Sequence, residues 1–279
     1  MIIHEETHDI DTKSGPMRLR LFKPRCGHDK GIEGGSSLMW GGVIVHAEIY
    51  QVTGPLERFC RMIASEGYVV VIGECYHELE PPGTALPYDK DGTDRGNAHK
   101  KEKPIEAFDS DARALVDFLI MRDDCNGNIA SVGMCLGGHL ALRNAFLPEV
   151  IAAFCLFPTD IQAASLGAGG DDTMEQLASG TPMDTELAFV FGKQDNHVPP
   201  HGRAQIYEAL VKGKHDFQWL ELNAQHAFIR DELSKGRYDP SLAAVCYGVM
   251  FELFRRRLTF GAESSAVVQP QKVPGDPEC

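Results

Sequence analysis

Cys135 lies between two glycines in the segment Gly133-Met134-Cys135-Leu136-Gly137, and its thiol could act as a nucleophile. An apolar run at residues 128–132 predicts a strand before it, and residues 138–147 predict a helix after it. This order is typical of a nucleophile elbow, here with cysteine in the serine position. A helix N-terminus favours a thiolate, and the Leu136 N–H could stabilise an oxyanion. The alternative is a glycine-rich turn around a structural cysteine.

An acid and a base follow Cys135 in the order expected of a triad on such a scaffold. Asp195 comes shortly after a predicted strand at residues 187–191, and His226 comes shortly after one at 217–222. Ligand sites in open α/β sheets lie at the carboxyl ends of the strands. We therefore predict that His226 takes the thiol proton and that Asp195 orients His226. Each could instead be an ordinary turn or loop residue.

The other histidines fit the role of base less well. His139 lies one helical turn after Cys135 and should point away from it, and His197 is too close to Asp195 in sequence to be oriented by it. His46 has no acid partner in the expected order. His77 and Glu78 resemble part of a zinc motif that lacks its second histidine, so we expect no metal and no cofactor.

Strands and helices alternate along the chain and predict an α/β fold, with a mostly parallel central sheet and helices on both faces. Further strands are predicted at residues 43–45, 68–72 and 150–157, and further helices at 54–65, 105–121, 202–211 and 241–258. We expect one domain over residues 1–260. Residues 76–103 are predicted to form a long lid-like loop, and 261–279 a flexible C-terminal tail.

Composition narrows the classes of partner. The 279 residues carry a formal charge of −13, which argues against nucleic acid and against an anionic membrane surface. Apolar runs are too short to span a bilayer. The eight cysteines are scattered and form no C-x-x-C pair. The first residues turn charged at once, which is unlike a signal peptide. These features favour free thiols in a reducing, cytoplasmic compartment and a small-molecule partner; the oligomeric state stays open.

Several segments together resemble the dienelactone hydrolase family, cysteine α/β-hydrolases that open lactones and esters. They are the elbow at residues 133–138, Gly192-Lys-Gln-Asp-Asn-His-Val-Pro199, and His226-Ala-Phe-Ile-Arg230, with residues 47–50 and 82–86. The resemblance extends over residues 15–258. It implies the α/β-hydrolase fold, with Cys135 as nucleophile, Asp195 as acid and His226 as base.

The resemblance also implies roles around the triad. Glu48 matches a glutamate that pairs with the resting thiol and moves away as substrate binds. Arg230 matches an arginine that holds this glutamate and can meet a substrate carboxylate. The N–H groups of Ile49 and Leu136 match an oxyanion hole. By the same resemblance, Tyr50 and Tyr76 are expected to contribute to substrate binding.

One departure concerns specificity. Relatives that cleave dienelactone have a second arginine shortly after the tyrosine that matches Tyr76, whereas this chain has Glu78 and Glu80 there. An acidic cluster would repel a carboxylate substrate. Arg95, Lys100, Lys101 and Lys103 could supply a displaced positive charge, or they could form a solvated lid face. Residues 89–103 are also longer than in the type members, and Ala227 replaces a hydroxyl residue.

We predict a hydrolase that cleaves an ester or lactone through a thioester on Cys135. One alternative is a thioesterase or general carboxylesterase on the same scaffold. Another is a non-catalytic protein that retained the pocket and binds a small molecule. A third is a redox-sensing thiol, for which Cys75 or Cys155 would have to lie near Cys135 in space.

Overall fold

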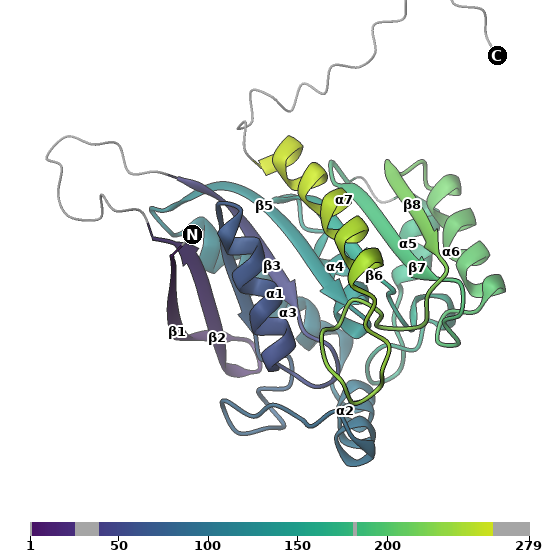
Figure 1. Ribbon diagram of the computed structural model, residues 1–279, viewed down its shortest axis with the longest axis horizontal. Coiled ribbons are helices and arrows are strands. Elements are labelled where there is room, and N and C mark those ends of the chain that lie inside the picture. The colour runs from purple at the N-terminus through teal and green to yellow at the C-terminus, as the bar shows by residue number, and fades with distance from the viewer. Residues whose placement is uncertain (1, 26–38, 181–182, 259–279) are drawn as a thin grey trace, which may run out of the picture.

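The computed structural model describes residues 2–25, 39–180 and 183–258, and its eight strands form one sheet (Figure 1). The strand order is β1-β2-β4-β3-β5-β6-β7-β8, parallel except where β1 pairs with β2 and β2 with β4. The predicted C-terminal tail lies outside the described residues. The α/β-hydrolase fold predicted from the sequence is confirmed.

The strands are β1 (Ile3–Thr12), β2 (Gly15–Pro24), β3 (Trp40–His46), β4 (Tyr68–Gly73), β5 (Cys125–Met134), β6 (Val150–Leu156), β7 (Glu186–Gly192) and β8 (Phe217–Leu222). The helices are α1 (Gly54–Ser65), α2 (Lys90–Glu102), α3 (Ile105–Ile120), α4 (Leu136–Asn144), α5 (Thr173–Ser179), α6 (Pro200–Lys212) and α7 (Pro240–Leu258), with a short 3-10 turn at Ile161–Ala163.

Both faces of the central strands are buried under helices, which is why these strands read as continuous apolar runs. Every residue of β4 is buried. Val43 and Val45 face a core that includes α1 and α7, which lie on the same side in Figure 1. Ile44, between them, faces the core with α3 on the opposite side. Successive side chains of β3 therefore pack into the cores on opposite faces of the sheet, each under its own layer of helices.

Two parts of the fold have weak signals in the sequence. The hairpin of β1 and β2 was not among the predicted strands, because β1 is an edge strand whose residues are mostly charged or partly exposed. The prediction of a loop over residues 76–103 is wrong in its second half, where the chain forms helix α2. Only Gly92, Gly96 and Lys100 of α2 are buried, so the helix has no apolar stripe. Helix α5 was missed as well.

Helix α2 is held by its cap and by close packing of glycines. The Asp89 side chain accepts a hydrogen bond from the Gly92 N–H at 2.8 Å. A Cβ at Gly96 would lie 2.2 Å from the Ile49 carbonyl oxygen, so only glycine permits this approach. The helix is thereby fixed against the segment that follows β3.

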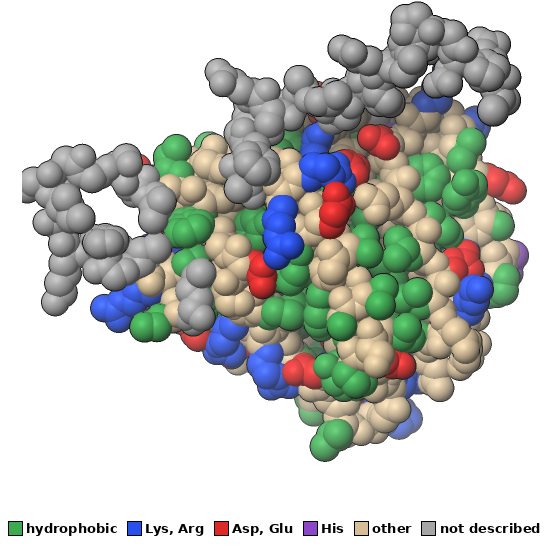
Figure 2. Space-filling model, turned by 45° about the horizontal axis from the view of Figure 1, so that its top comes forward, with side chains coloured by type: hydrophobic (Ala, Val, Ile, Leu, Met, Phe, Trp, Pro, Cys, Tyr) green, Lys and Arg blue, Asp and Glu red, His purple; other side chains and the backbone are tan. Residues whose placement is uncertain are grey.

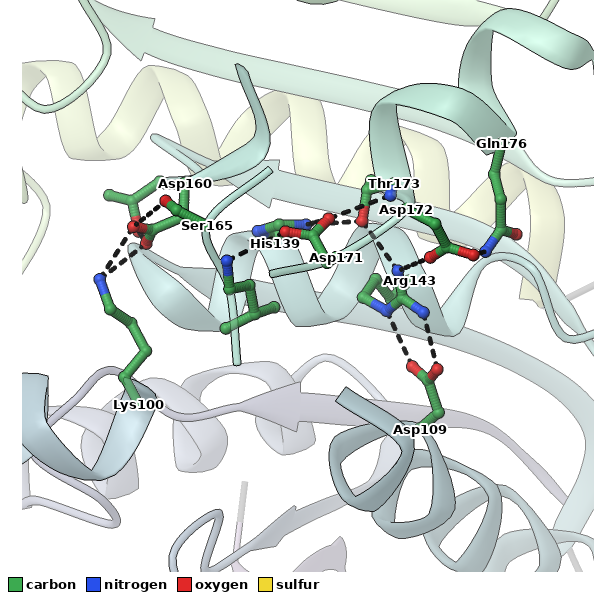
Figure 3. A network of polar contacts seen from close by, with 12 residues as sticks. Lys100, Asp109, His139, Arg143, Asp160, Ser165, Asp171, Asp172, Thr173 and Gln176 are labelled. Atoms are coloured by element: carbon green, nitrogen blue, oxygen red, sulfur yellow. Dashed lines mark hydrogen bonds and ion pairs between the residues drawn. The ribbon is translucent and has the colours of Figure 1, made fainter. Parts of the chain in front are cut away.

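A buried polar network anchors α4, the helix that follows Cys135 (Figure 3). Arg143 donates to Asp109 of α3 at 2.7 and 2.8 Å and to Asp172 at 2.7 Å. His139 is fully buried and bonds Thr173 at 2.8 Å. Figure 3 shows His139 among these groups, which agrees with the expectation that it points away from the thiol.

Charges of both signs are interspersed on the face seen in Figure 2. Helix α7 contributes ion pairs from Arg255 to Glu66 at 2.7 Å and from Arg256 to Glu186 at 2.8 Å. Within the described ranges, no helix is both long and apolar enough to cross a membrane.

We expect His46 to make stability depend on pH. Burial lowers the pKa of His46 to about 3, although Asp111 opposes the shift. The unfolded chain binds a proton near pH 6.5 and the folded chain does not, so stability should fall as pH drops below that value. Between about pH 7 and 4.5, His46 should account for about 2.5 kcal/mol of this loss. Urea unfolding of the wild type and His46→Gln would measure it; identical pH dependence in both proteins would contradict the prediction.

Candidate active site

Cys135 lies at the turn between β5 and α4 in a left-handed backbone conformation, with φ 59° and ψ −122°. The turn is so tight that a Cβ at Gly133 would lie 2.1 Å from the Gly137 carbonyl oxygen. A Cβ at Gly137 would lie 2.1 Å from the carbonyl oxygen of His46, at the end of β3. Both glycines are thus required, as a nucleophile elbow predicts. Cys135 is partly exposed, whereas the other described cysteines are buried.

The predicted acid and base meet the thiol at the carboxyl edge of the sheet. Asp195 and His226 follow β7 and β8, and His226 Nδ1 lies 2.7 Å from Asp195 Oδ2. The other oxygen of Asp195 accepts the His197 N–H at 2.8 Å, which fixes the carboxylate. With Nδ1 bonded to Asp195, the remaining ring nitrogen is available to Cys135, which lines the same cavity and raises the pKa of His226.

The electrostatics favour a charged His226. Burial alone would lower the pKa of His226, but the adjacent Cys135 and Asp195 outweigh it and raise that pKa to about 10. Burial would raise the pKa of Asp195, yet its hydrogen bond with His226 holds the pKa below the usual value. The imidazole ring also packs edge-on against Phe157, with centroids 5.2 Å apart. His226 is thus held between Asp195 and Cys135, both of which raise its pKa.

Backbone donors lie beside the thiol. Leu136 is the first residue of α4, so its N–H has no partner within the helix. In the described part of the chain, neither this N–H nor that of Ile49 donates to another protein group. Ile49, Cys135 and His226 line one cavity of about 310 Å³. Both donors are free to accept the role of an oxyanion hole that the sequence predicts for them, which stays a prediction.

Glu48 and Arg230 form a buried ion pair next to this cavity. Arg230 Nη1 lies 2.9 Å from Glu48 Oε1, and the Tyr88 hydroxyl donates to the other carboxylate oxygen at 3.4 Å. The guanidinium also lies over the Tyr88 ring, 4.5 Å from its centroid. Burial raises the pKa of Glu48, although Arg230 opposes the shift. Glu48 is thus held by Arg230, which leaves the thiol to His226.

The two tyrosines expected at the substrate site occupy different environments. Tyr50 lines the cavity, and its hydroxyl lies 2.9 Å from Thr93 Oγ1 of α2. Tyr76 is fully buried, does not line the cavity, and donates its hydroxyl to the Gly96 carbonyl at 3.1 Å. The geometry corrects the expectation for Tyr76: it supports α2 rather than contacting the cavity.

The acidic cluster expected to repel a carboxylate is neutralised. The Glu80 side chain is fully buried between Arg95 and His99, with contacts of 2.5 Å to each. Glu78 Oε1 lies 2.8 Å from the ammonium of Lys103. Neither glutamate lines the cavity. Residues of α2 and Lys103, directly after it, therefore supply the compensating charge, and the expectation of a repulsive entrance is wrong.

The sequence reasoning missed two cations at the cavity. Lys235 and Arg237 follow the His226 motif and line the cavity together with Arg230 and Lys100. Lys100 is paired with Asp160 at 2.9 Å. Among the described residues, Lys235 and Arg237 have no acidic partner. Their spacing shortly after His226 was the available signal, since residues on this loop return to the sheet edge.

Two groups of side chains could offer ligands to a metal ion. One is Asp195, His197 and His226, whose ligand atoms lie within 4.8 Å of one another; it overlaps the triad. The other is His77, Glu78 and Asp111, where the Lys103 ammonium already contacts both carboxylates. The second group is thus satisfied by a cation of the chain itself.

Comparison with known proteins gives the family. The model of the Dienelactone hydrolase family matches residues 32–258. The chain belongs to this family. It is 44% identical over 262 residues to the Saccharomyces cerevisiae protein named "Putative carboxymethylenebutenolidase", covering 92% of this chain and 93% of that protein. It is 27% identical to carboxymethylenebutenolidase of Pseudomonas putida, covering 73% of this chain and 80% of that protein.

A solved structure agrees with this assignment at the level of the fold. The structure of a "Putative Dienelactone Hydrolase" from Klebsiella pneumoniae has a TM-score of 0.76 and 18% identity, covering 92% of this chain and all of that chain. Family membership and these relatives make the chain a hydrolase of the dienelactone hydrolase family.

We expect His226 to stay protonated well above neutral pH in the wild type, because its pKa is raised to about 10. Replacing Cys135 by Ala removes a group that raises the pKa of His226 and should lower that pKa by about one to three units. An NMR titration of the labelled His226 ring would follow the change. Cys155→Ala, at a buried cysteine of β6, is the control; equal His226 titration in all three proteins would contradict the assigned charge pair.

Proposed function

We propose that the protein hydrolyses a carboxylic ester or lactone through a thioester on Cys135. One observation carries the proposal: His226, bonded to Asp195 at 2.7 Å, lines the same cavity as Cys135 and Ile49. In the described part of the chain, the N–H groups of Ile49 and Leu136 donate to no other protein group. A charged imidazolium next to the sulfur favours the thiolate, which is the reactive form of cysteine.

Acylation begins when the Cys135 thiolate attacks the ester carbonyl carbon. The carbonyl oxygen becomes an oxyanion, which accepts hydrogen bonds from the N–H groups of Ile49 and Leu136. The oxyanion then re-forms the carbonyl and the carbon–oxygen bond to the leaving group breaks. The His226 imidazolium gives its proton to the departing oxygen, so an alcohol or enol is released and a thioester remains.

Deacylation uses the same groups in reverse. Neutral His226 accepts a proton from water, whose oxygen attacks the thioester carbonyl. The same two N–H groups stabilise the second oxyanion. As the carbonyl re-forms, the carbon–sulfur bond breaks and the acid product leaves. The Cys135 thiolate and the His226 imidazolium are then restored, with Asp195 holding the ring throughout.

The Glu48–Arg230 pair is suited to control the thiol. Family resemblance implies that the matching glutamate can pair with the resting thiol. Here Arg230 holds Glu48 at 2.9 Å, which leaves the sulfur to His226. We therefore assign this arrangement to the active state, and the state with Glu48 on the thiol to a resting one that protects the sulfur from oxidation.

The charges of the cavity favour a substrate with an anionic group. Lys235 and Arg237 line it without acidic partners among the described residues, and Arg230 is a third cation there. Asp160 is compensated by Lys100. We infer that Lys235 and Arg237 take the place of the arginine that relatives have after the tyrosine matching Tyr76.

Replacing Cys135 by Ala should reduce kcat for 4-nitrophenyl acetate by about 10³-fold or more, because no nucleophile remains. The release of 4-nitrophenolate measures the rate, and Cys155→Ala is the control. Mass spectrometry of acid-quenched wild type should show the acyl group on the peptide that contains Cys135. Stoichiometric alkylation of Cys135 without turnover of any ester would instead favour a binding protein.

Replacing Arg237 by Gln should raise KM for an anionic ester, mono-4-nitrophenyl succinate, by about three- to tenfold. The reason is the loss of one charge-assisted contact. For neutral 4-nitrophenyl acetate, KM should change little. Lys212→Gln on α6 is the control for the net charge of the protein. A KM that rises equally for both esters would contradict a role for Arg237 in recognising the anion.

A further inference from the structure

A second cavity of about 230 Å³ is lined by both Glu48 and Arg230, and it shares Arg230 with the catalytic cavity. It is formed between α1, Tyr247 of α7 and the segment at residues 229–238. Figure 1 shows α1 and α7 on the same face of the sheet. Its lining includes the apolar side chains of Leu56, Phe59, Met62, Met134, Ile229 and Tyr247. We call this space the apolar chamber.

The apolar chamber adjoins the catalytic cavity through one side chain. Arg230 lines both spaces, and Glu48 lines the chamber only. Arg230 is 6% exposed, and its Nε is buried without a hydrogen-bond partner in the part of the chain that the structure describes. A buried guanidinium N–H without an acceptor is costly. An oxygen atom of a ligand that extends past Arg230 would satisfy it.

The chain itself also connects the two spaces. Met134, which lines the chamber, directly precedes the nucleophile Cys135, which lines the catalytic cavity. Glu48, which lines the chamber, directly precedes the oxyanion donor Ile49. On both segments, therefore, neighbouring residues of the chain line the two spaces.

We propose that the apolar chamber binds the acyl chain of the substrate, which is a short aliphatic chain or an aromatic ring. This inference rests on the proposed ester hydrolysis. The leaving group must depart, and water must reach His226, through the cavity that His226 lines. The acyl group stays on the sulfur between the two steps, so the chamber is the space that it can occupy throughout.

Size and polarity agree with such an occupant. An engineered apolar cavity of about 150 Å³ already binds benzene, so the chamber has room for a ring or a short chain. At its rim, Arg58 Nε lies 2.6 Å from Asp231 Oδ2, and both residues line the chamber. Because these charges are paired with each other, the apolar lining determines what binds. The substrate is then an ester with an apolar acyl group and a polar leaving side.

The test measures kcat/KM for 4-nitrophenyl acetate, butanoate and hexanoate. Burial of each methylene should raise kcat/KM of the wild type by about fourfold until the chamber is filled. Met62→Trp narrows the chamber from α1 and should lower the hexanoate-to-acetate ratio by about tenfold. Met62→Ala widens it and should move the preferred chain towards greater length. Met121→Trp, at a side chain that is 77% exposed after α3, is the matched control.

The outcomes separate the chamber from the proposed function. If the wild type cleaves esters but the hexanoate-to-acetate ratio is the same in all variants, the chamber assignment is overturned and ester hydrolysis stands. Binding of methyl hexanoate and methyl acetate to Cys135→Ala, followed by ligand-observed NMR, needs no turnover. Tighter binding of hexanoate that Met62→Trp abolishes supports the chamber even if no ester is cleaved. Equal binding of the two esters overturns it.

Discussion

The site depends on a strained turn that close backbone packing holds in place. Cys135 has a positive φ, which is unfavourable for any residue with a Cβ. The turn persists because Gly133 packs against the Gly137 carbonyl, and Gly137 against the carbonyl of His46. Strands β3 and β5 and helix α4 thus meet at this turn without side chains between their backbones. The strain aims the sulfur at His226 and leaves the Leu136 N–H free, so one local constraint places both the nucleophile and an oxyanion donor.

Charge compensation is the second theme of the site. Helix α2 and Lys103, the residue after it, carry the cations that pair with Glu78, Glu80 and Asp160. Glu78 and Glu80 do not line the catalytic cavity, and Asp160, which does, is compensated by Lys100. Only then do Lys235 and Arg237 define its charge. An overall formal charge of −13 therefore coexists with a cationic cavity. The net charge governs long-range repulsion of large polyanions. Which small molecule binds depends instead on the few charged groups that line the cavity.

The interior of the sheet and the order of triad residues could be predicted because both leave periodic or local signals. Apolar runs marked the buried strands, and the residue after each strand must lie at one edge of a parallel sheet. Helix α2 and the hairpin of β1 and β2 left no such signal. The helix packs through Gly92 and Gly96 rather than through an apolar stripe, and β1 lies at an edge where charged residues are favourable. Tyr76 was misplaced because its burial depends on α2.

By itself the sequence predicted a nucleophile, an acid and a base, because Cys135, Asp195 and His226 each follow a strand that the apolar pattern reveals. It also determined the glycines that the elbow requires. Only the tertiary structure decided how charges are paired, which tyrosine lines the cavity, and that Glu48 and Arg230 line a second, apolar space. The physical reason is that such contacts join loops and helix ends far apart in the chain, where neither periodicity nor spacing specifies which side chains meet.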